Sequence, residues 1–134
     1  MSGETAIERL IREMQPKLNS GAYVFCSLPP DAIPAALHPV CLFQEAEGTT
    51  LILPQVEADK LNLSYSFIAA WITLIIHSSL EAIGLTAAVS QALAAERISC
   101  NIVAAFYHDH LFVKLEDGER AMEVLRQMSQ NKGR

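Results

Sequence analysis

The spacing of apolar residues along the chain predicts four helices. Within each of them, apolar residues recur every three or four positions, which places their side chains on one face of a helix. Thr5 and Glu8 have the spacing of a capping box at the start of the first helix, and Pro54 suits the first turn of the second. The predicted helices cover about residues 5–16, 55–62, 84–96 and 118–129.

Runs of β-branched, aromatic and other apolar residues between the helices predict six strands. Gly48, in the sequence AEG, and Asp109, in the sequence YHDH, each lie between two such runs, so two hairpins are expected. Residues 17–20 are predicted as a loop, and residues 29–39, which hold four of the six prolines, as a loop with no more than one helical turn. The predicted strands cover residues 22–28, 40–45, 49–53, 68–76, 100–106 and 111–115.

Each half of the chain has the same order of elements, with a strand, a crossover, a hairpin and a helix. This order predicts an α+β protein built by duplication of a ferredoxin-like βαββα unit, with antiparallel sheets covered on one side by helices. The predicted repeats are residues 1–66, with a degenerate crossover and an extra N-terminal helix, and residues 67–134. Neither half shows a convincing fourth strand, so at least one shared or swapped strand is expected.

Composition narrows the class of protein. The chain has 134 residues, of which 51% are hydrophobic, and its net charge of −5 is spread along the sequence, which does not suit a nucleic-acid surface. Cys26, Cys41 and Cys100 are far apart and favour buried thiols in a reducing compartment. The N-terminus does not resemble a secretory signal, and the longest apolar run, residues 67–76, is shorter than the roughly 20 residues of a membrane span. We therefore expect a cytoplasmic protein with no cofactor and no contact to membrane or nucleic acid.

The turn HSSLEAIG between the strand at 68–76 and the helix at 84–96 is the candidate for a binding site. Unpaired backbone N–H groups at a helix N-terminus can receive an anion or a carboxylate, and glycine permits close backbone approach. Two interpretations of Gly84 remain open, because it also serves as ordinary punctuation at a helix start. Ser78 and Ser79 are likewise suited equally to ligand contact and to capping.

The second half of the chain resembles the ACT domain, a small regulatory module that binds amino acids. Gly84 and Leu85 match the glycine and aliphatic residue at the family's strand-to-helix turn, and LAAERISCNIV resembles the passage into the second strand. The segment HSSLEAIGLTAAVSQALAA is also similar to the ACT modules of cytosolic arginine sensors. The chain departs from the common pattern at Ile83, where the family usually has proline. Residues 67–128 carry the resemblance well, and the first half carries it only in outline.

The resemblance implies a non-catalytic regulatory module that binds an amino acid, forms a homodimer and acts on a separate partner. It implies that the backbone at the helix start, Ile83, Gly84, Leu85 and Thr86, contacts the amino acid's carboxylate or amino group. The turn residues His77, Ser78 and Ser79 would line the site. Asn101, in the second strand, would contact ligand across an interface.

The histidines suggest a metal site that we do not predict. His108 and His110 form an HxH pair, and His77 could add a third imidazole. The hairpin turn is expected to pass through Asp109, which would splay the two flanking rings at the sheet edge.

Two other functional classes remain as alternatives. An enzyme is not predicted, because Cys26 and Cys100 lie inside expected strands, where a thiol behaves as a small apolar group, and no catalytic residue stands out. A structural or protein-interaction module without a ligand is the main alternative, with an open sheet edge as its functional surface.

Overall fold

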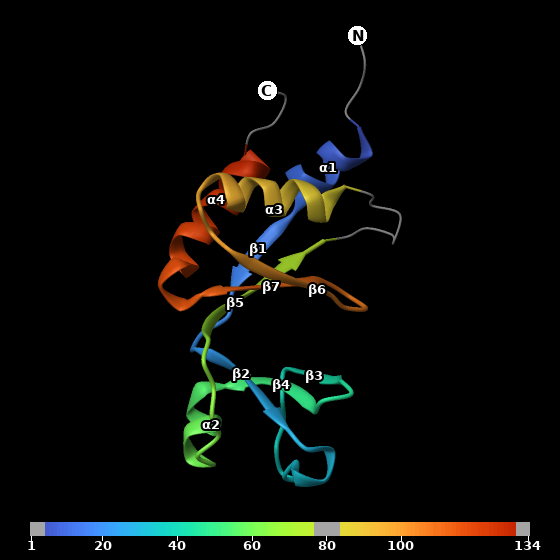
Figure 1. Ribbon diagram of the computed structural model, residues 1–134. Helices are drawn as coiled ribbons and strands as arrows, with labels where there is room; N and C mark the ends of the chain where they lie inside the picture. Colours follow the sequence, from blue (N-terminus) through green and yellow to red (C-terminus); the bar gives the residue numbers. More distant parts are fainter. Residues whose placement is uncertain (1–4, 77–83, 131–134) are drawn as a thin grey trace.

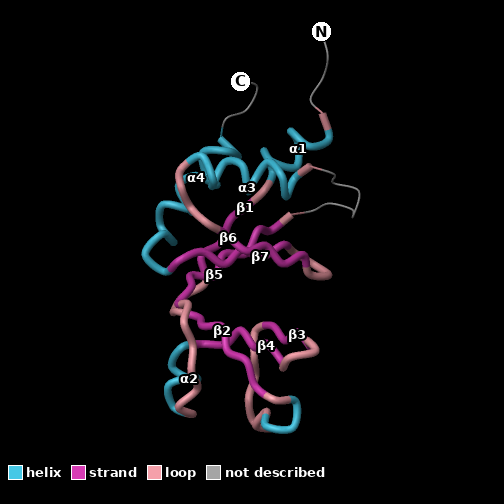
Figure 2. Tube along the Cα trace, viewed as in Figure 1, coloured by secondary structure: helices cyan, strands magenta, loops and turns pink. Residues whose placement is uncertain are grey.

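The computed structural model describes residues 5–76 and 84–130 (Figure 1). Its strands form one curled, antiparallel sheet in the order β3-β4-β2-β5-β7-β6, and β1 pairs with β5 beside this path. The predicted α+β fold of two tandem ferredoxin-like repeats is confirmed, and each half carries its helices on one side of its strands (Figure 2).

The C-terminal half contains the longer elements. They are β5 (Ile68–Ile75), α3 (Leu85–Ala95), β6 (Cys100–Ala104), β7 (Asp109–Lys114), the 3₁₀ turn η2 (Leu115–Asp117) and α4 (Gly118–Gln130). The apolar stripe of α3 buries Leu85, Val89 and Leu93 against the sheet, as the helical spacing predicts.

The N-terminal half repeats this order with shorter elements. They are β2 (Tyr23–Leu28), the 3₁₀ turn η1 (Pro30–Ala32), β3 (Cys41–Gln44), β4 (Thr49–Pro54) and α2 (Gln55–Lys60). The proline-rich crossover forms only the three-residue turn η1, which buries none of its residues. Pro54 precedes α2 and occupies its N-cap position.

The segment before β2 belongs structurally to the C-terminal half. Helix α1 (Ala6–Glu13) starts at the predicted capping box, with Thr5 and Glu8 bonding each other's backbone N–H groups. It ends before strand β1 (Gln15–Leu18), which pairs with β5 from Gln15 opposite Ile75 to Leu18 opposite Ile72. The prediction of a loop from residue 17 was therefore wrong. The sequence QPKL contains proline and no β-branched residue, so it forms a strand because β5 offers it an open edge, not because of its own propensity.

Strand β5 is shared by the two halves, which confirms the expectation of a shared strand. Its start pairs with β2, where Ala69 lies opposite Tyr23 and Ile68 lies opposite Val24. The rest of the strand pairs with β7 on one side and with β1 on the other. The N-terminal half thus takes β5 as its fourth strand, and the C-terminal half takes β1.

Three apolar clusters hold the fold together. The largest lies between the C-terminal strands and helices α1, α3 and α4, and a smaller one lies between the N-terminal strands and α2. The third lies between two half-sheets, one made of β2, β3 and β4 and the other of β5, β6 and β7. It joins their helix-free faces, which face each other in Figure 2. There, the rings of Phe25 and Phe112 meet edge to face with centroids 5.7 Å apart. No helix among the described residues combines the length and apolarity that a membrane crossing needs.

Candidate functional site

Gly84 is the N-cap residue of α3 and has a left-handed backbone conformation. Its φ is 98° and its ψ is −12°, a conformation that residues with a Cβ atom rarely adopt. The first helical hydrogen bond runs from the Ala88 N–H to the Gly84 carbonyl, over 2.9 Å. The glycine therefore serves as helix punctuation, one of the two roles that the sequence leaves open, since its φ lets the chain enter the helix.

The N-terminus of α3 differs from those of the other described α-helices. Its N-cap residue has no side chain that could accept a hydrogen bond, and its first turn contains no acidic residue. Helices α1, α2 and α4 each carry a glutamate in the first turn, and α1 also has its threonine cap. The positive end of the α3 dipole is thus not compensated by the helix's own cap or first turn, which suits an anionic group.

The predicted site residues divide into those that the structure places and those that it does not. Leu85 is 2% exposed and packs into the core, so only its backbone is available to a ligand. Thr86 is exposed on the first turn of α3. The remaining residues of the predicted turn, His77, Ser78, Ser79 and Ile83, lie outside the described residues.

Asn101 lies on the opposite face of the sheet from the start of α3. It is exposed on β6 and pairs in register with Phe112, whose side chain belongs to the cluster between the half-sheets. Leu85 belongs to the cluster on the helix side. A single copy of the chain therefore does not bring Asn101 and the Gly84 turn to one site.

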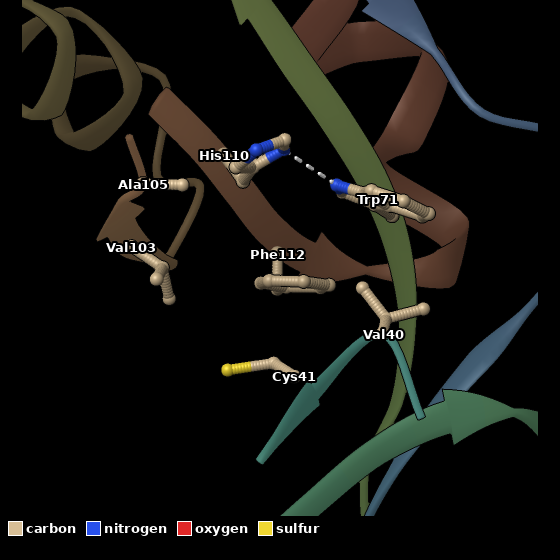
Figure 3. A pocket seen from close by; sticks show the side chains of 7 residues that line it. All are labelled: Val40, Cys41, Trp71, Val103, Ala105, His110 and Phe112. Atoms are coloured by element: carbon tan, nitrogen blue, oxygen red, sulfur yellow. Dashed lines mark hydrogen bonds between the residues drawn. The ribbon is translucent and has the colours of Figure 1, made fainter. Parts of the chain in front are cut away.

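A cavity of about 160 Å³ lies between the helix-free faces of the two half-sheets (Figure 3). The N-terminal half supplies one wall from the start of β3, and β5, β6, β7 and the hairpin turn supply the other. Its lining side chains are Val40, Cys41, Trp71, Val103, Ala105, His110 and Phe112. The described lining contains no lysine, arginine, aspartate or glutamate, and His110 is its one histidine.

A chain of hydrogen bonds holds the imidazole of His110 at this cavity. The Trp71 indole Nε1 donates to His110 Nδ1 over 3.0 Å, as the dashed line in Figure 3 shows. The hydroxyl of Thr73 lies 3.1 Å from the same nitrogen and accepts a hydrogen bond from the amide of Asn19. Since an indole N–H can only donate, Nδ1 must be the unprotonated nitrogen, and the ring proton resides on Nε2.

Burial keeps His110 neutral. Desolvation of the imidazole, assisted by the charge of His108, lowers the pKa of His110 from its ordinary value, and the nearby Asp109 opposes this only in part. Among the described residues, no group of three or more histidine, cysteine, aspartate or glutamate side chains could hold a metal ion. The imidazole of His110 is therefore positioned as an uncharged hydrogen-bonding group.

The expected place of His110 at the sheet edge was wrong, because the hairpin turn lies earlier in the chain than predicted. The turn was predicted at Asp109, but Asp109 is the first residue of β7, and the Ala105 N–H closes the turn by bonding the His108 carbonyl over 3.0 Å. His110 consequently lies inside the strand opposite Thr73, not splayed at the sheet edge. The alternation of His110 with Phe112 in the strand register was the available signal.

Comparisons with known proteins agree on one family. Two family models described as ACT domain match the chain, one over residues 2–70 and the other over residues 66–127. Among proteins with curated descriptions, no relative matches the chain.

Several solved structures are similar over most of the chain. One is a Vibrio cholerae protein described as being of unknown function and as a possible transport protein, with 40% identity, a TM-score of 0.85, and coverage of 93% of this chain and 97% of the other. An Agrobacterium tumefaciens protein has 19% identity and a TM-score of 0.67 over 87% and 89% of the two chains. The ligand-free regulatory subunit of aspartate kinase from Thermus thermophilus has 12% identity and a TM-score of 0.58 over 84% and 95%. The last two show a common fold.

Proposed function

This chain belongs to the ACT domain family, and from that membership we propose that it is a non-catalytic regulatory module that binds a free amino acid. The observation that carries the proposal is the N-terminus of α3, which has a glycine cap and no acidic residue in its first turn. The regulatory subunit of aspartate kinase, which has the same fold, supports a regulatory role.

The proposed ligand contacts are those that the family resemblance implies. The backbone N–H groups following Gly84 would receive the amino acid's carboxylate, and the exposed hydroxyl of Thr86 would add a polar contact. His77, Ser78, Ser79 and Ile83 complete the proposed site from the preceding turn. Backbone groups select for the carboxylate and not for the side chain, so these contacts serve any free amino acid alike.

A homodimer forms part of the proposal, and a second copy would bring Asn101 into reach of ligand. Strands β3 and β6 end the sheet, so each has one edge unpaired within the described residues. Such edges favour pairing with another strand. Light scattering during size-exclusion chromatography should give twice the chain mass, and a strict monomer at high concentration would contradict this part of the proposal. The regulated partner is a separate protein, and the setting is the cytoplasm.

A thermal-shift screen of the common amino acids, arginine and the branched-chain amino acids included, tests the ligand. A compound that binds only the folded state stabilises it by about 2.7 kcal/mol at a hundredfold excess over Kd, which raises Tm by several degrees. The variant Gly84→Ala should lose this shift, because alanine strains the conformation and places a Cβ atom at the helix mouth. Gly21→Ala is the matched control, because Gly21 has nearly the same φ, 94°, with nothing within 4 Å of an added Cβ.

A protein-interaction module without a ligand is the second candidate. It is favoured by Phe106 and Tyr107, which are 89% and 79% exposed at the β6–β7 turn and whose rings meet edge to face, with centroids 4.8 Å apart. Exposed aromatic residues of this kind are typical of interaction surfaces. Silence across the whole amino-acid screen would favour this second candidate over the first.

A further inference from the structure

We infer that the cavity between the two half-sheets is a second binding site, for a small uncharged molecule with one aromatic ring and one hydrogen-bond acceptor. This site is separate from the proposed amino-acid contacts at the start of α3, because it opens on the helix-free face of the sheet and the start of α3 lies on the other face. Asn101 shares the helix-free face but does not line the cavity. A negative binding result at one site therefore does not decide whether the other site binds its ligand.

The size and lining of the cavity suit a single ring. A protein cavity of about 150 Å³ accommodates one benzene molecule, and this one measures about 160 Å³. Its walls include Trp71 and Phe112, whose rings lie nearly parallel at an interplanar angle of 18°, and the aliphatic side chains of Val40 and Val103. Flat aromatic molecules pack well against such ring pairs.

The imidazole of His110 selects the acceptor. Trp71 and Thr73 occupy its Nδ1, so the remaining ring donor is the Nε2–H, and no described residue bonds that nitrogen. Asn19 bonds both the Thr73 hydroxyl and the Trp71 carbonyl, which holds this arrangement in place before any ligand arrives. Only a ligand with an acceptor can use this donor.

The absence of charge around the cavity selects an uncharged ligand. None of the described lining residues is lysine, arginine, aspartate or glutamate, and the imidazole is held neutral. A buried charge without a partner is costly, so a carboxylate or an ammonium group would bind poorly. Heteroaromatic nitrogens and carbonyl oxygens are acceptors that meet these conditions.

Pyridine and benzene form a matched pair of probes, because they have the same shape and differ by one acceptor. Trp71 is the only tryptophan, so its indole N–H gives one signal in a ¹H–¹⁵N spectrum of the full chain at pH 7.5. We expect both probes to move this signal saturably. We expect His110→Leu to weaken pyridine relative to benzene about three- to tenfold, the value of one hydrogen bond. Equal changes for both probes would overturn the role of His110, and no saturable shift with either would overturn the site.

Two further measurements test the site if a variant does not fold. If His110→Leu does not fold, the imidazole ¹⁵N signals of the unmodified protein answer the same question, since pyridine should move Nε2 and benzene should not. Val103→Phe should fill the cavity and abolish binding of both probes. Leu42→Phe is its control, because Leu42 lies on β3 beside Cys41 but pairs with Leu51, on the helix side of the sheet. Binding that survives Val103→Phe would place the probes elsewhere.

Discussion

The two halves of the chain share an order of elements but bury very different cores. Among the described residues, the cluster of the C-terminal half holds fourteen buried side chains and that of the N-terminal half holds five. The crossover accounts for much of this difference, because α3 buries three apolar residues where η1 buries none. The C-terminal repeat has a full crossover helix, whereas the N-terminal repeat has only a short turn there and contributes Val40 and Cys41 to one side of the cavity.

The largest predicted effect is a difference in core stability between the halves. Leu93→Ala, in the C-terminal core, should lower the free energy of unfolding by about 3–5 kcal/mol. Leu53→Ala, equally buried in the N-terminal core, should cost about 2–3 kcal/mol, since a smaller cluster collapses more readily around the missing atoms. Urea unfolding measures both. Equal losses would show that the two cores are equally rigid and would break the comparison.

One glycine in each half, Gly118 and Gly48, leaves little room for an added Cβ atom. A Cβ atom at Gly118 would lie 3.0 Å from the Ala70 Cβ on the central strand β5, which cannot move aside. Gly118→Ala should therefore destabilise by about 1–2 kcal/mol after the gain in helix propensity. At Gly48, the closest atom is the Ser27 hydroxyl oxygen at 2.8 Å, which can rotate away. Gly48→Ala should cost less than Gly118→Ala in thermal unfolding, and the opposite order would contradict this account of the contacts.

The two conformationally special glycines give a smaller and nearly equal effect. Gly84→Ala and Gly21→Ala should each destabilise by about 1 kcal/mol, because both native φ values disfavour a residue with a Cβ atom. Denaturant unfolding without added ligand measures this baseline. A much larger loss for Gly84→Ala would mean that contact with Ile7 Cδ1, 3.9 Å from the added Cβ, is tighter than the geometry indicates.

The smallest predicted effect concerns pH and again separates the halves. Since the pKa of His110 is lowered in the folded protein, the unfolded chain takes up this proton more readily. The resulting stability is present above the ordinary histidine pKa of about 6.5 and is lost as pH falls through the folded pKa. Melting temperatures at pH 7.5 and 5.5 should therefore differ less in His110→Gln than in the parent. His38→Gln, at an exposed position of the N-terminal half, should keep the full difference.

The sequence predicts well the elements that their own residues define. The capping box fixed the start of α1, the apolar stripe fixed α3, and the proline-rich crossover excluded a long helix. Strand β1 escaped prediction because its pairing is decided by β5 and not by the sequence QPKL. The place of His110 was not predicted, because the turn was expected at Asp109 whereas β7 already begins there, which puts His110 in the strand opposite Thr73. The spacing of residues within a segment does not predict contacts that depend on its register with a distant strand.

The pairing of β1 with β5 has a consequence for how the chain acquires its structure during synthesis. Residues 15–18 leave the ribosome early, but their partners at positions 72–75 emerge only after the whole N-terminal half has been made. Contacts so distant in sequence slow folding, and β1 cannot dock on β5 until residues 72–75 have been made. A fragment that begins at residue 67 would expose the edge of β5 that β1 covers. A cut at that position would therefore remove two of the strands with which β5 pairs, β1 and β2.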